Sequence, residues 1–200
     1  MTKFKMTYAS GSTPLDPNEI LDLIPDYIST MEELNQVEQS NISDAFVWAE
    51  NQDLSALLTG TFIFKLHERM FNQVWKWAGK IRKSNKNLGA SKESIMNDLG
   101  QLLNDTEYWI KNKTFINDEL AVRFHHRLVQ IHIFTNGNGR HARLMTDLLL
   151  VYLSEPKFSW GTSQESQLLN VEGKTRNEYL KALRQADQGQ FKTLIQFARN

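Results

Sequence analysis

The sequence predicts an all-α protein: a helical bundle with one small β-hairpin and an N-terminal helical extension. Through most of its 200 residues, apolar side chains recur every three or four positions, the spacing of an amphipathic helix. Hydrophobic residues make up 40% of the chain, which is enough for one domain with a substantial core. A polar stretch at residues 83–91, punctuated by Asn and Gly, is typical of a hairpin or loop.

The N-terminal extension is expected to cover residues 1–52. Asp16 suits the N-cap of a short helix, which Pro25 ends. Ser29 or Thr30 then caps a longer helix, and the glutamates that follow are placed for a capping box. This second helix is expected to bury one apolar face, made of Leu34, Val37, Ala45 and Trp48.

Helical patterns continue through residues 53–200, which are expected to form the main domain. The segment at 144–153 is nearly all apolar, so we expect it to be the central buried helix, ended by Glu155 and Pro156. The other expected helices are residues 54–77, residues 94–112, one opening at Asn117, and a final pair that begins near Arg176 and is separated at 187–189.

Composition excludes several classes of function. The formal net charge is zero and no long basic run appears, which argues against direct nucleic-acid binding. The chain has no cysteine, so it forms neither disulfides nor thiolate metal sites. No apolar run reaches the length of a membrane span, and the N-terminus lacks a signal-peptide core. We therefore expect a cytoplasmic protein with no membrane partner.

The candidate chemistry lies at residues 132–143, between two helical patterns. Gly137 and Gly139 tolerate positive φ, so successive backbone N–H groups can form an anion-binding nest, to which the following helix adds its N-terminus. Arg140 and Arg143 share one face of that helix and suit phosphates. The unperturbed pKa of a histidine, about 6.5, suits His132 to accept a proton near neutral pH. Each feature alone is commonly structural, but together they indicate phosphoryl or nucleotidyl transfer.

These residues resemble the signature of the Fic (Fido) family, His-x-Phe-x-(Asp/Glu)-Gly-Asn-Gly-Arg-x-x-Arg, at every fixed position except Asn136. The resemblance extends over about residues 54–197 and is strongest to the subgroup called "mobile mystery protein B", which is found beside a helix-turn-helix regulator. It implies the Fic fold and protein adenylyltransfer. His132 would deprotonate a Tyr, Thr or Ser hydroxyl of a target protein, which attacks the α-phosphate of ATP. The nucleotide-binding positions implied are Phe134 (as the loop's anchor in the core), Gly137, Asn138, Gly139, Arg140 and Arg143.

Asn136 stands where the family usually has the acidic residue that binds Mg²⁺. An Asn side chain offers one neutral oxygen, whereas a hard cation prefers carboxylate. We therefore expect Mg²⁺ to remain required but to bind more weakly than it would with a carboxylate at this position.

Two further roles follow from the resemblance. Many relatives carry an inhibitory glutamate that pairs with the second motif arginine, so Glu38 is expected to bond Arg143, although Leu34 and Gln39 depart from the inhibitory motif. Residues 83–91 occupy the position of the family's flap, a β-hairpin that pairs by backbone with the target. Asn87 and Leu88 are the expected tip residues of this flap.

Other functions remain open at the level of sequence. One alternative is Fic-type transfer of the γ-phosphate, against which the intact Gly137-Asn138-Gly139 loop argues. A second is removal of AMP from a modified protein. A third is a non-catalytic, toxin-like binding module that partners a helix-turn-helix regulator; Asn136 favours it, and the complete set of His132, Arg140 and Arg143 argues against it.

Overall fold

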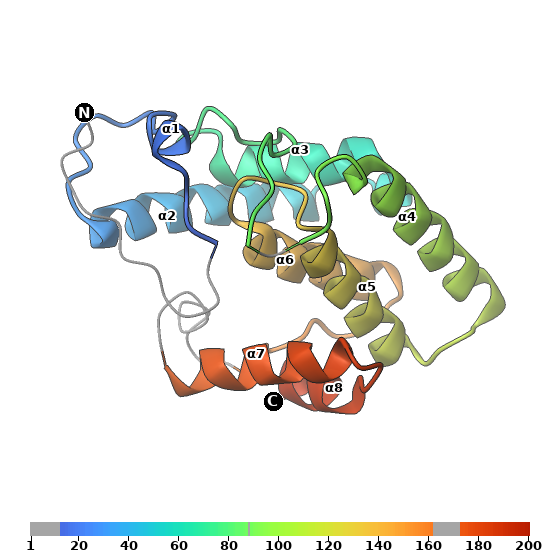
Figure 1. Ribbon diagram of the computed structural model, residues 1–200. Helices are drawn as coiled ribbons and strands as arrows, with labels where there is room; N and C mark the ends of the chain where they lie inside the picture. Colours follow the sequence, from blue (N-terminus) through green and yellow to red (C-terminus); the bar gives the residue numbers. More distant parts are fainter. Residues whose placement is uncertain (1–12, 88, 162–172) are drawn as a thin grey trace.

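The computed structural model describes residues 13–87, 89–161 and 173–200 (Figure 1). These residues are mainly helical and include no strand, which confirms the all-α prediction. No described helix is long and apolar enough to cross a membrane. The helices are α1 (Pro17–Ile20), α2 (Met31–Glu50), α3 (Gly60–Phe71), α4 (Ile95–Asn112), α5 (Asn117–Ile131), α6 (Asn138–Tyr152), α7 (Lys174–Ala186) and α8 (Lys192–Arg199), with a 3-10 turn, η1 (Leu54–Ala56), before α3.

Helices α1 and α2 begin at the capping residues that the sequence predicts. Thr30 accepts a hydrogen bond from the Glu33 N–H, and the Glu33 carboxylate accepts one from the Thr30 N–H, so the predicted capping box opens α2. Asp16 and Glu19 form the same arrangement at α1. These local hydrogen bonds satisfy N–H groups that a helix leaves without partners at its first turn.

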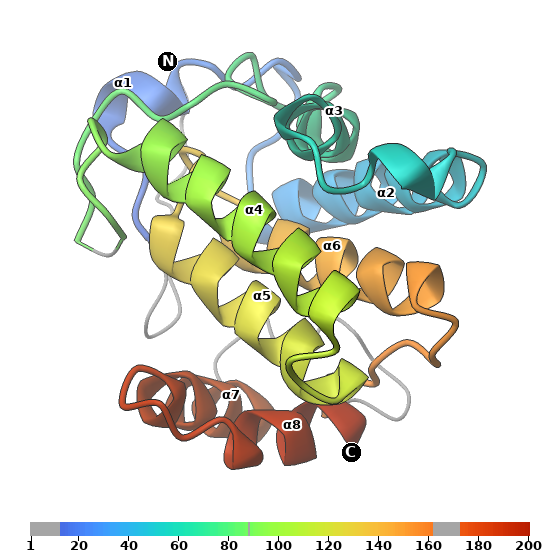
Figure 2. The same ribbon diagram turned by 90° about the vertical axis from the view of Figure 1, so that its right-hand side faces the viewer.

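Helices α5 and α6 lie at the centre of the bundle. Helix α4 packs along α5, while α2 and α3 cover one side and the α7–α8 pair covers the opposite side (Figures 1 and 2). The buried apolar residues form two clusters. The larger cluster joins α2 through α6, and the smaller one joins α5 and α6 to α7 and α8. The link between α5 and α6 packs into the larger cluster through Ile133 and Phe134.

The helix expected over 54–77 is shorter than predicted. It ends at Phe71, because the next backbone groups pair with the N-terminal segment. The Ile24 N–H donates to the Val74 carbonyl, and the Lys76 N–H donates to the Asp22 carbonyl. Apolar periodicity runs on to Trp77 since the turn residues Val74, Trp75 and Trp77 are buried as well. Apolar spacing indicates which residues are buried, but it does not distinguish a helix from a buried turn.

The β-hairpin expected at 83–91 is wrong for the described residues, which form bends and no strand there. Arg82 accounts for part of this difference, because its buried guanidinium binds the carbonyls of Ser84, Ala90 and His132. Carbonyls bound in this way do not form a cross-strand ladder. We call residues 83–87 and 89–91 the flap segment. Leu88, the second expected tip residue, lies outside the described residues.

Candidate active site

The motif loop leaves α5 at His132 and enters α6 at Asn138. His132 itself ends α5 in the left-handed conformation, with φ of 54°, which is uncommon for a residue with a side chain. Gly137, with φ of 77°, turns the chain into α6, and a Cβ on it would clash with the ring of Phe71. Glycine is therefore required at this position on two counts.

Asn138 closes the loop from within. Its side-chain oxygen accepts a hydrogen bond from the Phe134 N–H at 2.9 Å, and its amide donates to the Phe134 carbonyl at 2.8 Å. The side chain of Asn138 is thus directed into the loop. This leaves the backbone at the start of α6 as the group available to an anion.

His67 supports the loop from α3, a role that the sequence did not reveal. Its Nδ1 accepts from the Gly79 N–H at 3.0 Å, so its Nε2 carries the proton and donates to the Asn136 carbonyl, also at 3.0 Å. Its ring stacks on fully buried Phe134, with centroids 3.6 Å apart. Burial holds the pKa of His67 well below its usual value, and the imidazole stays neutral.

His132 lies buried at the bend, and its Nε2 is 3.1 Å from the Oγ1 of Thr13. Burial lowers the pKa of His132 to about 4, and the charges of Arg82 and Lys86 add to the effect. The imidazole is therefore neutral near pH 7 and able to accept a proton. Its carbonyl accepts a 2.7 Å hydrogen bond from the Nε of Arg82, which fixes the residue from its backbone side.

Arg140 is paired with Glu38. One terminal nitrogen, Nη1, lies 2.5 Å from Glu38 Oε2, and the guanidinium lies over the Phe71 ring. The other Glu38 oxygen accepts a hydrogen bond from the Trp75 indole at 2.6 Å. This corrects one expectation: Glu38 does contact a motif arginine, but it contacts the first and not Arg143.

Arg143 lies one turn of α6 from Arg140, but its side chain packs toward Tyr179 of α7. Its guanidinium is 5.9 Å from the Tyr179 ring centroid, and the Tyr179 hydroxyl is 2.9 Å from Nε2 of buried His125. A Cβ placed on Gly139 would be 3.8 Å from Nη1 of Arg143, so the guanidinium folds back over the start of α6. Burial lowers the pKa of Arg143, and the charge of Arg140 lowers it further. Among the described residues, no carboxylate lies within ion-pair distance of Arg143.

Asn136 is the expected metal position, and its side chain is already engaged. Its oxygen accepts from the Gly137 N–H at 2.6 Å, and its nitrogen donates to the Thr13 carbonyl at 3.1 Å. Within the described parts of the chain, no three His, Asp or Glu side chains are grouped as metal ligands. The residues present therefore do not fit a Mg²⁺ site built from protein carboxylates.

The flap segment packs against His132. The Arg82 N–H donates to the Ile133 carbonyl at 3.0 Å, and the Ala90 N–H donates to the Gln130 carbonyl at 3.1 Å. A Cβ on Gly89 would clash with His132. Asn87, the described member of the expected tip, is exposed.

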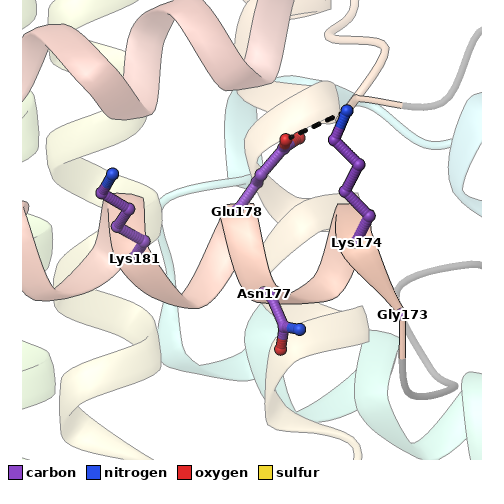
Figure 3. Close-up of a pocket in the computed structure, with 5 residues that line it drawn as sticks. All are labelled: Gly173, Lys174, Asn177, Glu178 and Lys181. Atoms are coloured by element: carbon purple, nitrogen blue, oxygen red, sulfur yellow. Dashed lines mark ion pairs between the residues drawn. The ribbon is translucent and has the colours of Figure 1, made fainter.

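A shallow pocket beside α7 contains none of the motif residues. Figure 3 shows its lining side chains on one helix, with Lys174 and Glu178 paired at 3.9 Å. Both of these side chains are exposed and the pair follows helical spacing, so it has the character of a solvated surface. The lining residues are Gly173, Lys174, Asn177, Glu178 and Lys181.

Comparison with known proteins shows which proteins this chain is similar to. Residues 57–150 match the model of the Fic/DOC family. Over 172 residues, the chain is 24% identical to a protein adenylyltransferase Fic from Aedes aegypti; the match covers 84% of this chain and 32% of the relative. Over 143 residues it is 29% identical to protein adenylyltransferase fic-1 from Caenorhabditis elegans, covering 68% and 25%. The chain spans about a third or less of these relatives.

Solved structures share the fold. Fic-1 from C. elegans matches with a TM-score of 0.62 at 24% identity, over 90% of this chain and 51% of that one. The BepC effector protein from Bartonella, solved with bound AMPPNP, matches with a TM-score of 0.68 at 14% identity, over 92% and 97%. At these identities the likeness establishes the architecture alone.

Proposed function

We propose that this chain, whose residues 57–150 match the Fic/DOC family model, is a protein adenylyltransferase that moves AMP from ATP to a hydroxyl of a target protein. The observation that carries the proposal is the neutral, buried His132, whose Nε2 meets a hydroxyl at the bend leading into α6. The names of the relatives from Aedes aegypti and C. elegans support the same activity.

The chemistry uses groups of this chain that are already in position. His132 Nε2 takes the proton of the attacking hydroxyl, the oxygen bonds to the α-phosphorus, and pyrophosphate leaves. The backbone N–H groups at the start of α6, with Arg140 and Arg143, offset the phosphate charge. Catalysis thus relies on positioning and on fixed positive charge.

We propose further that Glu38 inhibits the enzyme. Its carboxylate neutralises Arg140 in this state, so a nucleotide phosphate must displace a buried carboxylate before it reaches that guanidinium. Arg143, held against Tyr179, stays available to the nucleotide. Inhibition through Arg140 therefore weakens the phosphate site while it leaves half of the arginine pair in place.

The test is transfer of label from α-labelled ATP, in buffer containing Mg²⁺, to the proteins of a cell lysate. Glu38→Gln removes the negative charge and is expected to raise labelling. Adding His132→Ala to that variant should reduce labelling about 100-fold or more, because it removes the general base. If neither the parent nor Glu38→Gln labels any protein, the proposed function is wrong.

A parallel reaction with γ-labelled ATP separates adenylyl transfer from phosphate transfer, since only the α-label stays on protein in the first case. Three finer features are proposed on the resemblance alone: membership of the "mobile mystery protein B" subgroup, a helix-turn-helix regulator as partner, and action in the cytoplasm. Co-purification of the tagged full chain from its native host, followed by mass spectrometry, tests for the regulator.

A further inference from the structure

We propose that Thr13 is a self-modification site, at which the enzyme attaches AMP to its own N-terminal segment. This inference rests on the proposed function. Thr13 Oγ1 lies 3.1 Å from Nε2 of His132, although 119 positions separate the two residues in the chain. Both residues are buried, with exposed fractions of 7% and 8%. A hydroxyl of this chain thus already occupies the place from which the base would take a proton.

A second contact fixes the backbone of the same residue. The Thr13 carbonyl accepts a hydrogen bond from the side-chain nitrogen of Asn136 at 3.1 Å. An ionised carboxylate at position 136 has no proton to donate, so it could not make this contact. The Asn that departs from the family pattern therefore binds the peptide that carries the hydroxyl.

The residues after Thr13 are held by the flap segment. Lys86 Nζ lies 3.0 Å from Asp16 Oδ2 and 2.5 Å from Glu19 Oε2, and its side chain is almost fully buried. The Ser84 hydroxyl also bonds Asp16. Figures 1 and 2 show the chain before α1 running past the flap segment toward the start of α6. The N-terminal segment therefore lies between the flap segment and the motif loop, as a docked acceptor would.

The proposed step balances without a further reactant besides ATP. The Thr13 hydroxyl proton passes to His132 Nε2, and a bond forms between Oγ1 and the α-phosphorus. The bond from the α-phosphorus to the pyrophosphate oxygen breaks, and pyrophosphate leaves. The product is a phosphodiester between AMP and Thr13, and the proton on His132 returns to solvent.

The experiment uses the full chain with Glu38→Gln, incubated alone with α-labelled ATP and Mg²⁺. Thr13→Val keeps the side-chain shape and removes the hydroxyl, so it should lose most of the self-label. Thr13→Ser should retain it. Thr114→Val removes an exposed hydroxyl between α4 and α5 and should label like the parent. Fragmentation of the peptide cut before Asp16 should place AMP on Thr13 rather than on Ser10 or Ser12.

Two controls separate this inference from the proposed function. Because the acceptor is in the same molecule, the fraction labelled per minute should not change when the protein is diluted. If Thr13→Val labels itself as strongly as the parent, or AMP is found on another hydroxyl, the Thr13 inference is overturned even where lysate proteins are labelled. If no variant labels itself or any lysate protein, the adenylyltransferase proposal fails with it.

Discussion

The carboxylate of Glu38 bonds Arg140 through one oxygen, at 2.5 Å, while its other oxygen accepts a hydrogen bond from the Trp75 indole. The glutamate comes from α2, the arginine from α6 and the tryptophan from the turn after α3. One buried side chain thus ties the extension both to the phosphate site and to the core. One oxygen pairs with Arg140 and the other accepts from Trp75, so a substitution can remove one contact and keep the other.

The first prediction compares Glu38→Gln with Glu38→Ala. Both variants remove the charge that holds Arg140, so both should label protein faster than the parent. Only the alanine leaves the Trp75 N–H buried without an acceptor, which costs about 1–3 kcal/mol. Urea unfolding should therefore find Glu38→Ala less stable than Glu38→Gln by that amount. Equal stabilities would show that the indole hydrogen bond contributes nothing.

The second prediction concerns Arg82, which is 2% exposed and donates to three backbone carbonyls. Replacing it with Met keeps an unbranched, flexible side chain but leaves those carbonyls without a donor. We expect the free energy of unfolding to fall by about 3 kcal/mol, since each buried unsatisfied group costs about 1–3 kcal/mol and water reaches some of them. The loss of the 2.7 Å bond to the His132 carbonyl should also lower kcat.

Arg82→Lys is the matched control for that variant. It retains the positive charge, but one ammonium group cannot bind three carbonyls in the fork geometry of a guanidinium. Unfolding and labelling rates should therefore fall for Lys as well as for Met. Wild-type stability in the Lys variant would mean that charge matters there and the hydrogen bonds do not.

Local signals in the sequence were sufficient for the start of α2 and for the motif loop. The capping box of Thr30 and Glu33 lies within four residues, and the bend at Gly137 requires glycine for its own φ. Local signals did not identify Arg140 as the ion-pair partner of Glu38. Its choice of Arg140 depends on how α2 sits against α3, which Asn41 fixes by bonding the backbone of Arg69 and Gln73.

The contacts of Arg82, His67 and Thr13 were unpredictable for the same reason. Each reaches the motif from far along the chain, and a single sequence carries no sign of which distant groups meet. Apolar spacing identifies a buried face but does not name the residue opposite. These contacts account for part of the irregular flap segment, because Arg82 binds the carbonyls of Ser84 and Ala90.

The third prediction is acid sensitivity of the fold. Burial is the largest cause that lowers the pKa of all five histidines, to about 3 for His125 and about 4 for His132 and His141. Unfolded histidines bind protons near pH 6.5, so these groups contribute stability above that pH and lose it as pH falls toward 4. Asp147 acts in the opposite direction, because burial raises its pKa to about 7. Because five histidines lose stability on acidification and one carboxyl gains it, we expect the free energy of unfolding to fall as pH falls.

Urea unfolding at pH 7.5 and at pH 5 measures this effect. Each histidine with a pKa of about 4 or below should contribute roughly 2 kcal/mol less at pH 5 than above pH 7. His141→Gln, which removes one such group, should make the decline with pH shallower. Stability that stays constant between these two pH values would contradict the assignment of neutral, buried imidazoles.

The fourth prediction is for Asn136→Asp. A carboxylate at this position is a better ligand for Mg²⁺ than the Asn oxygen, so the Mg²⁺ concentration giving half-maximal labelling should fall. The same change removes the donor to the Thr13 carbonyl and should weaken the hold on the N-terminal segment. Protease digestion near residue 13 should become faster. An unchanged Mg²⁺ dependence would count against a metal role for this position.

The last prediction is the pH dependence of catalysis itself. Since the pKa of His132 is lowered to about 4, the base stays unprotonated from pH 8 down to about pH 5. The acidic limb of kcat/KM for Glu38→Gln should therefore lie well below pH 6.5, provided that it is measured where the fold is intact. Lys86→Met removes one of the nearby charges that lower the pKa of His132, so the acidic limb of this variant should move to higher pH. The limb should still lie below pH 6.5, because burial is the larger cause of the lowered pKa. A limb at pH 6.5 or above in Glu38→Gln would mean that His132 is solvated when it reacts.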